Sequence, residues 1–453
     1  MKTFLDWSTY KHAGLGDAYA DIPPHGGDFA RSIAVCINSR VCESDGRQVM
    51  CPSFQVTGNP ALSPGGRVRL LKAALSSDLV ETAMDDPVLA EAMDLCVACK
   101  GCKRECEANV DMALIKAEYL AQRRARHGGS LRGWVLTRWP RWLDRWPMLH
   151  RVIAWRNRSR ALAWLGQSLL GLSARRCWPE TRQVEAPGRR ATPQDAAGEL
   201  PEVVLWVDTF CRLFEPDIAA AAHDVLTAAG YPVMVAGPAV DDDERGRALC
   251  CGRTALAQGR VDAARREAAR VVAALEPHLD AGRVVVGLEA SCVLGLRDDA
   301  QALGLGEAMA RVGGAVMLFE EFLAREIMAK RLQLPMTGNG GRRVLVHGHC
   351  HQKAVGAMKA VRRVLKRIPG LDFAMIEAGC CGMAGTFGLE AEHADLSIRM
   401  AERQLMPALR AEPAADVIAN GFSCRQQVRD LGDARPRHLA QLLRDCLLPE
   451  ETR

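Results

Sequence analysis

Apolar residues recur at helical spacing between cysteine-rich turns in the first quarter of the chain. Val68, Leu71 and Leu75 follow Pro64 at intervals of three and four residues, which predicts a helix through Ser76. Similar patterns predict a helix over about 86–95 and another after Asp111. This region is therefore expected to consist of helices that alternate with cysteine loops.

Short, continuous apolar runs replace this pattern in residues 199–453, and they predict buried strands. The segments that contain these runs begin at Val203, Val284, Arg343 and Val417, and helical stretches such as 218–229 and 263–275 separate them. Alternating strands and helices indicate α/β units with parallel sheets. The whole chain is therefore predicted to be α + α/β.

Seventeen cysteines in 453 residues are the unusual feature of an otherwise ordinary composition, with 48% apolar and 25% charged residues. An odd number excludes complete disulfide pairing, and most of the cysteines lie in tight groups, which are typical of metal sites.

Residues 1–24 contain no apolar run typical of a secretory signal, and no apolar stretch is long enough to span a membrane. We therefore expect a cytoplasmic protein, and the net charge of +5 suggests no nucleic-acid partner.

One group of cysteines has the spacing of a [4Fe–4S] ferredoxin loop: Cys96-x2-Cys99-x2-Cys102-x3-Cys106. In two-cluster ferredoxins the fourth cysteine of such a run ligates the other cluster. An upstream motif, Cys36-x2-Ser39-x2-Cys42 followed by Cys51, has the matching form. One cluster is then predicted to be held by Cys51, Cys96, Cys99 and Cys102.

The second ferredoxin-type site has only three cysteines, Cys36, Cys42 and Cys106, because Ser39 replaces the middle one. The alternatives are ligation by the serine oxygen, a three-iron cluster, a labile four-iron cluster, and an empty or differently ligated site. One [4Fe–4S] cluster is thus expected, and a second remains an open alternative.

An internal repeat accounts for eight further cysteines in the α/β region. Each copy has a cysteine after the first strand, a Cys-Cys-Gly sequence, and a Ser-Cys at the end of a later strand. Because ligands of parallel sheets lie at the carboxyl ends of the strands, each copy is predicted to hold a metal or an iron–sulfur cluster. The two sets are Cys211, Cys250, Cys251 and Cys292 in the first repeat, and Cys350, Cys380, Cys381 and Cys424 in the second.

Three histidines surround Cys350, at positions 347, 349 and 351. Alternation along an extended segment would place His347, His349 and His351 on one face, as metal ligands, as donors to cluster sulfurs or as substrate contacts. Lys353 is expected to be solvated. The alternatives for the repeats as a whole are a structural zinc site and buried free thiols.

Two ferredoxin motifs followed by two Cys-Cys-Gly repeats resemble the iron–sulfur subunits of the glycolate oxidase, anaerobic glycerol-3-phosphate dehydrogenase and lactate-utilisation type. Local segments of this chain are similar to the iron–sulfur half of FAD-linked D-2-hydroxyacid dehydrogenases, of the D-lactate and D-2-hydroxyglutarate kind. These segments are residues 50–54 with 66–69, 348–353, 379–385 and 421–425. The repeats also resemble a heterodisulfide reductase subunit, but Gly295 and Gln427 stand where that family has a further cysteine.

The resemblance implies an electron-transfer subunit of an FAD-linked 2-hydroxyacid dehydrogenase. No Gly-x-Gly-x-x-Gly fingerprint is present, so FAD is expected only on a partner subunit, with a quinone or a redox protein as the acceptor. The rival hypotheses are a thiol–disulfide reductase subunit and a zinc-organised interaction protein. The implied domains are a helical dicluster ferredoxin-like domain (1–127), a Trp/Arg-rich helical segment and linker (128–198), and the two repeats (199–335 and 336–453).

Seven of the nine tryptophans lie between Trp134 and Trp178, together with many arginines and one acid, Asp144, between 132 and 160. Such a segment suits helices that cover the cluster domain, a docking surface for a flavin subunit, or contact with a membrane surface through 130–178. The last alternative would place the protein at the inner face of the membrane.

Overall fold

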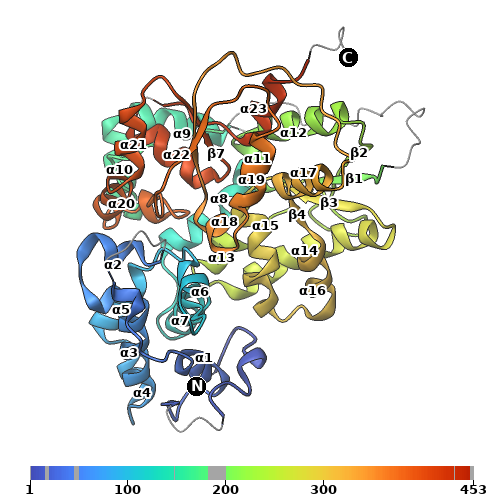
Figure 1. Ribbon diagram of the computed structural model, residues 1–453. Helices are drawn as coiled ribbons and strands as arrows, with labels where there is room; N and C mark the ends of the chain where they lie inside the picture. Colours follow the sequence, from blue (N-terminus) through green and yellow to red (C-terminus); the bar gives the residue numbers. More distant parts are fainter. Residues whose placement is uncertain are drawn as a thin grey trace.

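The N-terminal region of the computed structural model is helical (Figure 1). The structure describes residues 2–15, 20–44, 50–146, 148–181, 200–432 and 434–448. The three predicted helices are confirmed, and each begins at a side-chain cap, Ser63, Asp86 or Asp111, that accepts a backbone N–H of its first turn. The elements are η1 (Ser8–Tyr10), α1 (Asp28–Ala34), η2 (Val41–Glu43), α2 (Pro52–Thr57), η3 (Pro60–Leu62), α3 (Pro64–Leu75), α4 (Val80–Ala83), α5 (Pro87–Asp94), α6 (Gly101–Glu105) and α7 (Met112–His127).

The first repeat is built on a four-stranded parallel sheet in the order β2-β1-β3-β4. Its strands are short and almost entirely apolar, as expected for a sheet that helices cover on both faces. The strands are β1 (Val203–Trp206), β2 (Val233–Val235), β3 (Val284–Gly287) and β4 (Met317–Leu318). The helices are α11 (Thr209–Leu213), α12 (Pro216–Ala228), α13 (Arg253–Leu256), α14 (Val261–Asp280), α15 (Ala290–Arg297), η5 (Asp299–Leu303), α16 (Gly306–Ala315) and α17 (Phe319–Met328).

The second repeat has a three-stranded parallel sheet in the order β6-β5-β7, which is the arrangement of β2-β1-β3 again. The predicted α/β repeats are therefore present. The strands are β5 (Val344–His347), β6 (Phe373–Met375) and β7 (Asp416–Ala419). The helices are α18 (Cys350–Ala354), α19 (Met358–Leu365), η6 (Phe387–Leu389), α20 (Ala394–Glu402), α21 (Leu405–Ala411), α22 (Phe422–Leu431) and α23 (Leu439–Asp445).

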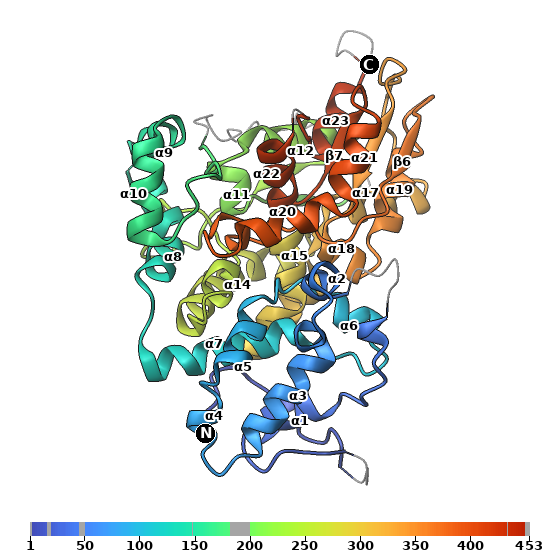
Figure 2. The same ribbon diagram turned by 90° about the vertical axis from the view of Figure 1, so that its left-hand side faces the viewer.

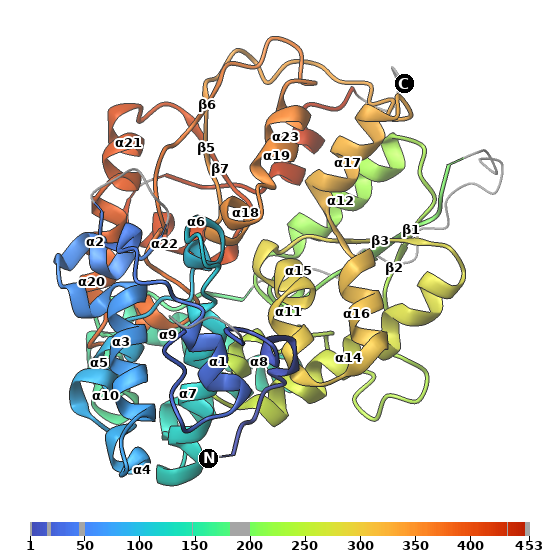
Figure 3. The same cartoon turned by 60° about the horizontal axis from the view of Figure 1, so that its bottom comes forward.

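Shared hydrophobic cores join the three regions. One core combines Phe29 and Leu71 of the N-terminal helices with Val285 and Leu296 of the first repeat. Another combines Val203 of the first repeat with Val344 of the second, and α12 packs against α23 across them. The three regions therefore have defined positions relative to one another (Figure 3).

The Trp/Arg-rich segment forms three helices along one edge of the molecule (Figure 2). They are α8 (Leu131–Arg145), α9 (Leu149–Arg158) and α10 (Arg160–Leu170). Arg141 of α8 pairs with Glu267 at 2.5 Å, and Asp144 accepts the backbone N–H of Ala248 at 2.8 Å, so α8 covers the first repeat. The predicted linker lies mostly in 182–199, outside the described residues. No helix in the described part of the chain is both long and apolar enough to cross a membrane.

Candidate metal centres

The four cysteines predicted for the complete ferredoxin site line one cavity. Cys96 and Cys99 lie on the loop between α5 and α6, Cys102 lies in the first turn of α6, and Cys51 immediately precedes α2. The backbone is left-handed at Cys51 (φ 54°), Ala98 (φ 48°) and Lys100 (φ 62°). These turns fold the loop around the cavity, and four thiols from two segments are the donor set that a [4Fe–4S] cluster requires.

A buried arginine balances the negative charge that thiolates would bring to this cavity. Arg67 is fully buried, and its Nη1 lies 3.2 Å from the Sγ of Cys51. Its other nitrogens donate to Ser53 Oγ (2.9 Å) and to the carbonyl of Ala92 (2.6 Å). Burial lowers the pKa of Arg67, but the charges of Cys51 and Cys96 outweigh it and raise the pKa. The sequence contains this arginine in a matched segment without revealing its role.

The upstream loop repeats the backbone of the complete site. Asn38 (φ 56°) and Arg40 (φ 58°) are left-handed at the same offsets from Cys36 as Ala98 and Lys100 are from Cys96. Ser39 therefore occupies the position of Cys99 in the second loop, as the overlay of the two motifs assumes, and it is exposed.

The three thiols of this second site are less enclosed than those of the first. Cys36, Cys42 and Cys106 are half-buried, and the Sγ of Cys42 accepts the backbone N–H of Gly65 at 3.3 Å. Burial is the main cause that raises the pKa of Cys42, and the neighbouring Cys36 contributes. Within the described residues, which exclude 45–49, no hydrogen bond joins Cys106 to Cys36 or Cys42.

The first Cys-Cys-Gly site brings together two cysteines, Cys251 and Cys292, that lie 41 positions apart in the sequence. Sγ of Cys251 lies 3.1 Å from Sγ of Cys292, and Cys250 contacts Cys251. Gly252 is left-handed (φ 79°), and a Cβ there would lie 2.6 Å from the carbonyl oxygen of Ala264. Glycine is thus required for the bend that lets the two adjacent thiols face one site.

The second Cys-Cys-Gly site repeats this geometry. Cys350 contacts Cys380, and Cys381 contacts Cys424. Gly382 is left-handed (φ 88°), and a Cβ at this position would clash with the carbonyl oxygen of Ser397. The structure therefore joins all four predicted cysteines of the second repeat through successive contacts. In the first repeat it joins Cys250, Cys251 and Cys292, while Cys211 is buried in α11.

The prediction that the Ser-Cys of each repeat lies at the end of a strand is wrong in detail. Cys211, Cys292, Cys350 and Cys424 lie in the first turn of the helix that follows each strand, in α11, α15, α18 and α22. Backbone N–H groups of a first helical turn have no partner within the helix, so they favour a nearby thiolate. The same arrangement occurs in both repeats.

The prediction of three histidines on one extended face is also wrong. β5 ends at His347 and α18 begins at Cys350, so the segment turns between them. His349 caps α18 through its Nδ1, which accepts the N–H of His351 at 3.3 Å. His347 is buried, and neither of its ring nitrogens has a hydrogen-bond partner within the described residues. Burial is the main cause that lowers the pKa of His349 to about 3, so this histidine is neutral.

Lys353 is not the solvated lysine that we expected. It is half-buried, and its Nζ donates to the carbonyl oxygens of Ala378 and, at 3.1 Å, Gly379. Burial lowers its pKa, while the four cysteines of the second repeat oppose that shift. Lys353 thus supplies positive charge beside the second Cys-Cys-Gly site.

The complete ferredoxin site lies directly against the second Cys-Cys-Gly site. Cys99 packs in one cluster with Cys380 and Cys350, and α6 lies beside α18 (Figure 3). Burial raises the pKa of Cys99 well above its usual range, and the charge of Cys350 is the next cause. Two of the three complete cysteine sets are therefore neighbours.

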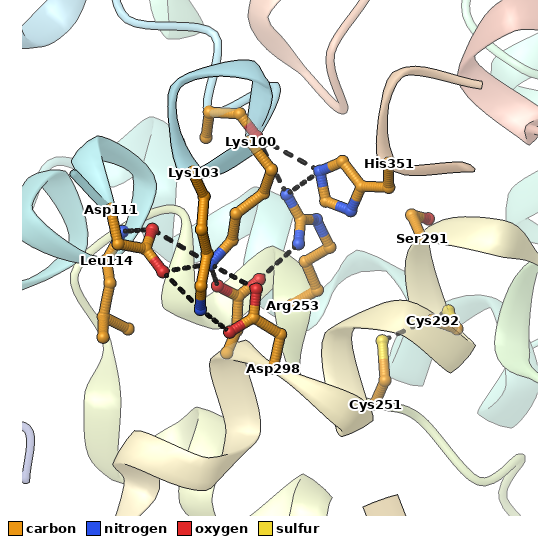
Figure 4. A network of polar contacts seen from close by, with 12 residues as sticks. Lys100, Lys103, Asp111, Leu114, Cys251, Arg253, Ser291, Cys292, Asp298 and His351 are labelled. Carbon is orange, nitrogen blue, oxygen red and sulfur yellow. Dashed lines mark hydrogen bonds and ion pairs between the residues drawn. The ribbon is translucent and has the colours of Figure 1, made fainter. Parts of the chain in front are cut away.

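Arg253 occupies the junction of the three complete sites (Figure 4). Its Nη2 lies 3.0 Å from Nε2 of His351 and 3.4 Å from the carbonyl oxygen of Ala98. Its Nη1 pairs with Asp299 at 2.5 Å. Burial lowers its pKa, but Asp299 and the cysteines of both repeats raise it more. Sequence analysis missed this residue, because its partners come from distant segments.

One of the two positions at which a further cysteine is missing, Gln427, has a structural role instead. The side chain of Gln427 accepts from Arg176 and donates to Ser397 at 3.1 and 3.2 Å. Gly295 lies in α15, where an added Cβ would be 3.9 Å from Arg253 Nη1. Each repeat therefore has four of the five cysteines of the heterodisulfide reductase pattern.

Two family models match parts of this chain. Residues 32–110 match the 4Fe–4S dicluster domain, and residues 344–429 match the cysteine-rich domain. The chain contains a 4Fe–4S dicluster domain and a cysteine-rich domain. This result confirms the resemblance and the expectation of iron–sulfur clusters. The first repeat lies outside both matched ranges.

Whole proteins with similar sequences include three dehydrogenases or oxidase components. The chain is 23% identical to D-2-hydroxyglutarate dehydrogenase of Pseudomonas putida, over 91% of this chain and 43% of that protein. It is 24% identical to the glycolate oxidase iron-sulfur subunit of Escherichia coli, over 92% and 95%. It is 25% identical to one subunit of the anaerobic glycerol-3-phosphate dehydrogenase of Escherichia coli, over 54% and 59%. The chain thus spans less than half of the D-2-hydroxyglutarate dehydrogenases, and no solved structure matches it.

Proposed function

We propose that this chain is the electron-transfer iron–sulfur subunit of an FAD-linked 2-hydroxyacid dehydrogenase, of the glycolate, D-lactate or D-2-hydroxyglutarate type. The observation that carries the proposal is the contact of Cys99, from the complete ferredoxin site, with Cys350 and Cys380 of the second repeat. Sites in contact suit a path for electrons, since iron–sulfur clusters are one-electron carriers.

The residues proposed to hold clusters are those that line the sites described above. Cys51, Cys96, Cys99 and Cys102 would hold a [4Fe–4S] cluster, while Cys36, Cys42 and Cys106, with or without Ser39, would form a second site. Each repeat would hold a further metal or iron–sulfur cluster. Arg67, Lys353 and Arg253 lie against these thiols and would offset their negative charge in the low-dielectric interior.

Oxidation of the hydroxy acid is proposed to occur on a separate flavoprotein. The Escherichia coli protein of which the match covers 95% is itself named as a subunit. The sequence of the present chain has no Gly-x-Gly-x-x-Gly fingerprint. The chain's own residues would then bind and orient the clusters, and would exclude water from Cys99 and Cys380, which are buried.

The exposed apolar face of α9 and α10 is proposed to dock the flavoprotein. Trp155 (65% exposed) and Trp164 (64% exposed) lie on it with Leu169, and no acid occurs between positions 145 and 179. Tryptophan and arginine are typical of interface centres. Contact with an anionic membrane surface is the alternative, and flotation with anionic vesicles at low salt distinguishes the two. If the protein floats with the vesicles and Trp155→Ser abolishes this flotation, the result favours contact with the membrane.

Anaerobic purification with analysis of iron, sulfide and zinc tests the proposal. We expect at least about four iron atoms and as many sulfides per chain from the complete ferredoxin site alone. The electron paramagnetic resonance signals should appear when the flavoprotein partner is reduced by its hydroxy acid. A colourless protein with zinc and no sulfide would instead support a zinc-organised interaction protein. Turnover of a disulfide by the isolated chain with a reduced dye would support a thiol–disulfide reductase subunit.

A further inference from the structure

A pocket opens between α7, α8 and the α13–α14 turn, and Cys250 and Gly252 form part of its wall. Apart from Cys250 and Gly252, the proposed electron-transfer role does not use the residues of this pocket. Its wall also contains the side chains of three threonines and Phe210. The threonines are Thr137, Thr209 and Thr254.

Arginines dominate the lining of the pocket. Three acids also line it, but each already has partners. Asp144 accepts the N–H of Ala248, Glu267 pairs with Arg141 and Arg247, and Asp262 pairs with Arg265. The six arginines of the lining are Arg124, Arg138, Arg141, Arg247, Arg260 and Arg266.

Three of these arginines converge without a carboxylate partner within the described residues. Arg124 Nε and Arg260 Nη2 lie 3.1 and 3.0 Å from the point where a Cβ on Gly129 would stand. Arg138 stacks on Trp134 at 4.7 Å and is close enough to Arg260 to disfavour its charge. Guanidinium groups gathered in this way repel one another, so a bound anion would offset the electrostatic repulsion between them.

Close backbone packing holds the arginines in this position. Gly259 is left-handed (φ 63°), and a Cβ there would lie 2.5 Å from the carbonyl carbon of Leu120. The α13–α14 turn therefore rests directly on α7, which brings Arg260 next to Arg124.

We infer that this pocket binds a small organic anion with two or more carboxylate or phosphate groups, next to Cys250 of the first Cys-Cys-Gly site. Arginine forks bind both groups in the same way, and the threonine hydroxyls supply further donors. A ligand in this pocket would lie against the wall that Cys250 forms.

Calorimetric titration of the holoprotein, purified anaerobically in a buffer without multivalent anions, tests the inference. The two probes are tricarballylate, for carboxylates, and pyrophosphate, for phosphates. We expect saturable binding at one site for at least one probe, and the tighter probe identifies the class. Arg138→Gln and Arg260→Gln should each weaken binding about tenfold.

Arg151→Gln is the matched control, because it removes the same charge from α9, outside the pocket. It should leave binding unchanged. Absence of saturable binding for both probes would overturn the inference, as would equal losses in the control and the pocket variants. Thermal unfolding without ligand verifies that each variant is folded. The measurement needs no electron transfer, so its outcome is independent of the proposed redox function.

Discussion

A single buried charge can decide whether a thiol site retains its metal, and Arg67 is the residue placed to do so. Its guanidinium contacts Cys51, Ser53 and the carbonyl of Ala92 with no exposure to solvent. Lysine cannot reproduce this fork, because its ammonium is a single point charge.

We predict that Arg67→Met lowers the iron content of the complete ferredoxin site and destabilises the protein by about 3–5 kcal/mol, since the thiolates lose their buried counter-charge. Iron analysis and thermal unfolding measure both effects. Lys72→Met on the same helix is the control and should cost less than about 1 kcal/mol. Equal iron content in the two variants would contradict the role of Arg67.

Ser39 is the second informative residue, because its loop has the left-handed positions of a cluster-binding loop without the middle thiol. We predict that Ser39→Cys increases the iron content or the stability of the cluster at the Cys36, Cys42 and Cys106 site. Electron paramagnetic resonance and iron analysis measure the gain. Ser8→Cys, which adds a thiol at another exposed position, should have no effect. An unchanged spectrum for Ser39→Cys would argue against the overlay of the two motifs.

At the scale of elements, a buried ion cluster attaches α6 to the first repeat (Figure 4). Nζ of Lys100 lies 2.8 Å from Asp111, 2.6 Å from Asp299 and 3.0 Å from Asp298. Lys100 is only 5% exposed and Asp111 only 1%. Because Asp299 also pairs with Arg253, which contacts His351 of the second repeat, the cluster holds the ferredoxin loop against both repeats.

We predict that Lys100→Met destabilises the protein by about 3–5 kcal/mol, because it leaves three carboxylates without their central cation. Denaturant unfolding measures the change in the free energy of unfolding. Lys103→Met is a matched control at the edge of the same cluster, where the side chain is 40% exposed, and should cost about 1 kcal/mol or less. A smaller loss for Lys100→Met than for the control would be the contrary result.

At the scale of the whole molecule, an ion pair joins the N-terminal helices to the second repeat. Nε2 of His393 lies 2.7 Å from Asp94, and Nδ1 lies 3.1 Å from Glu390. Burial lowers the pKa of His393, but the hydrogen bonds to Asp94 and Glu390 outweigh it and raise the pKa to about 9. The unfolded chain should have the ordinary histidine value of about 6.5.

A raised pKa in the folded state means that protonation stabilises the fold. We predict that this contribution is complete below about pH 6.5 and is lost as the pH rises to about 9. Since Asp94 is half exposed, the expected loss is about 1–2 kcal/mol. Unfolding of wild type and His393→Gln at pH 6 and pH 9.5 measures it, with exposed His12→Gln as the control. The difference between wild type and His393→Gln should shrink at the higher pH, and a constant difference would refute the assignment.

Local sequence determined much of this protein. The spacing of Cys96, Cys99 and Cys102 places three thiols on one short loop, and caps such as Ser63 and Asp86 begin the predicted helices. Apolar runs such as Val203–Trp206 give the strands, and the repeated motif predicts two similar α/β units. These features depend on backbone geometry and burial within a few residues, which periodicity reports directly.

Only the tertiary structure decided which distant groups meet. It turned His349 into a helix cap, buried Lys353 beside the thiols, and placed Arg253 where three sites converge. It also brought Cys99 against Cys350 and gathered Arg124, Arg138 and Arg260 around one pocket. Periodicity shows that a face is buried but not what lies opposite it, because that partner is selected by packing among segments hundreds of residues apart.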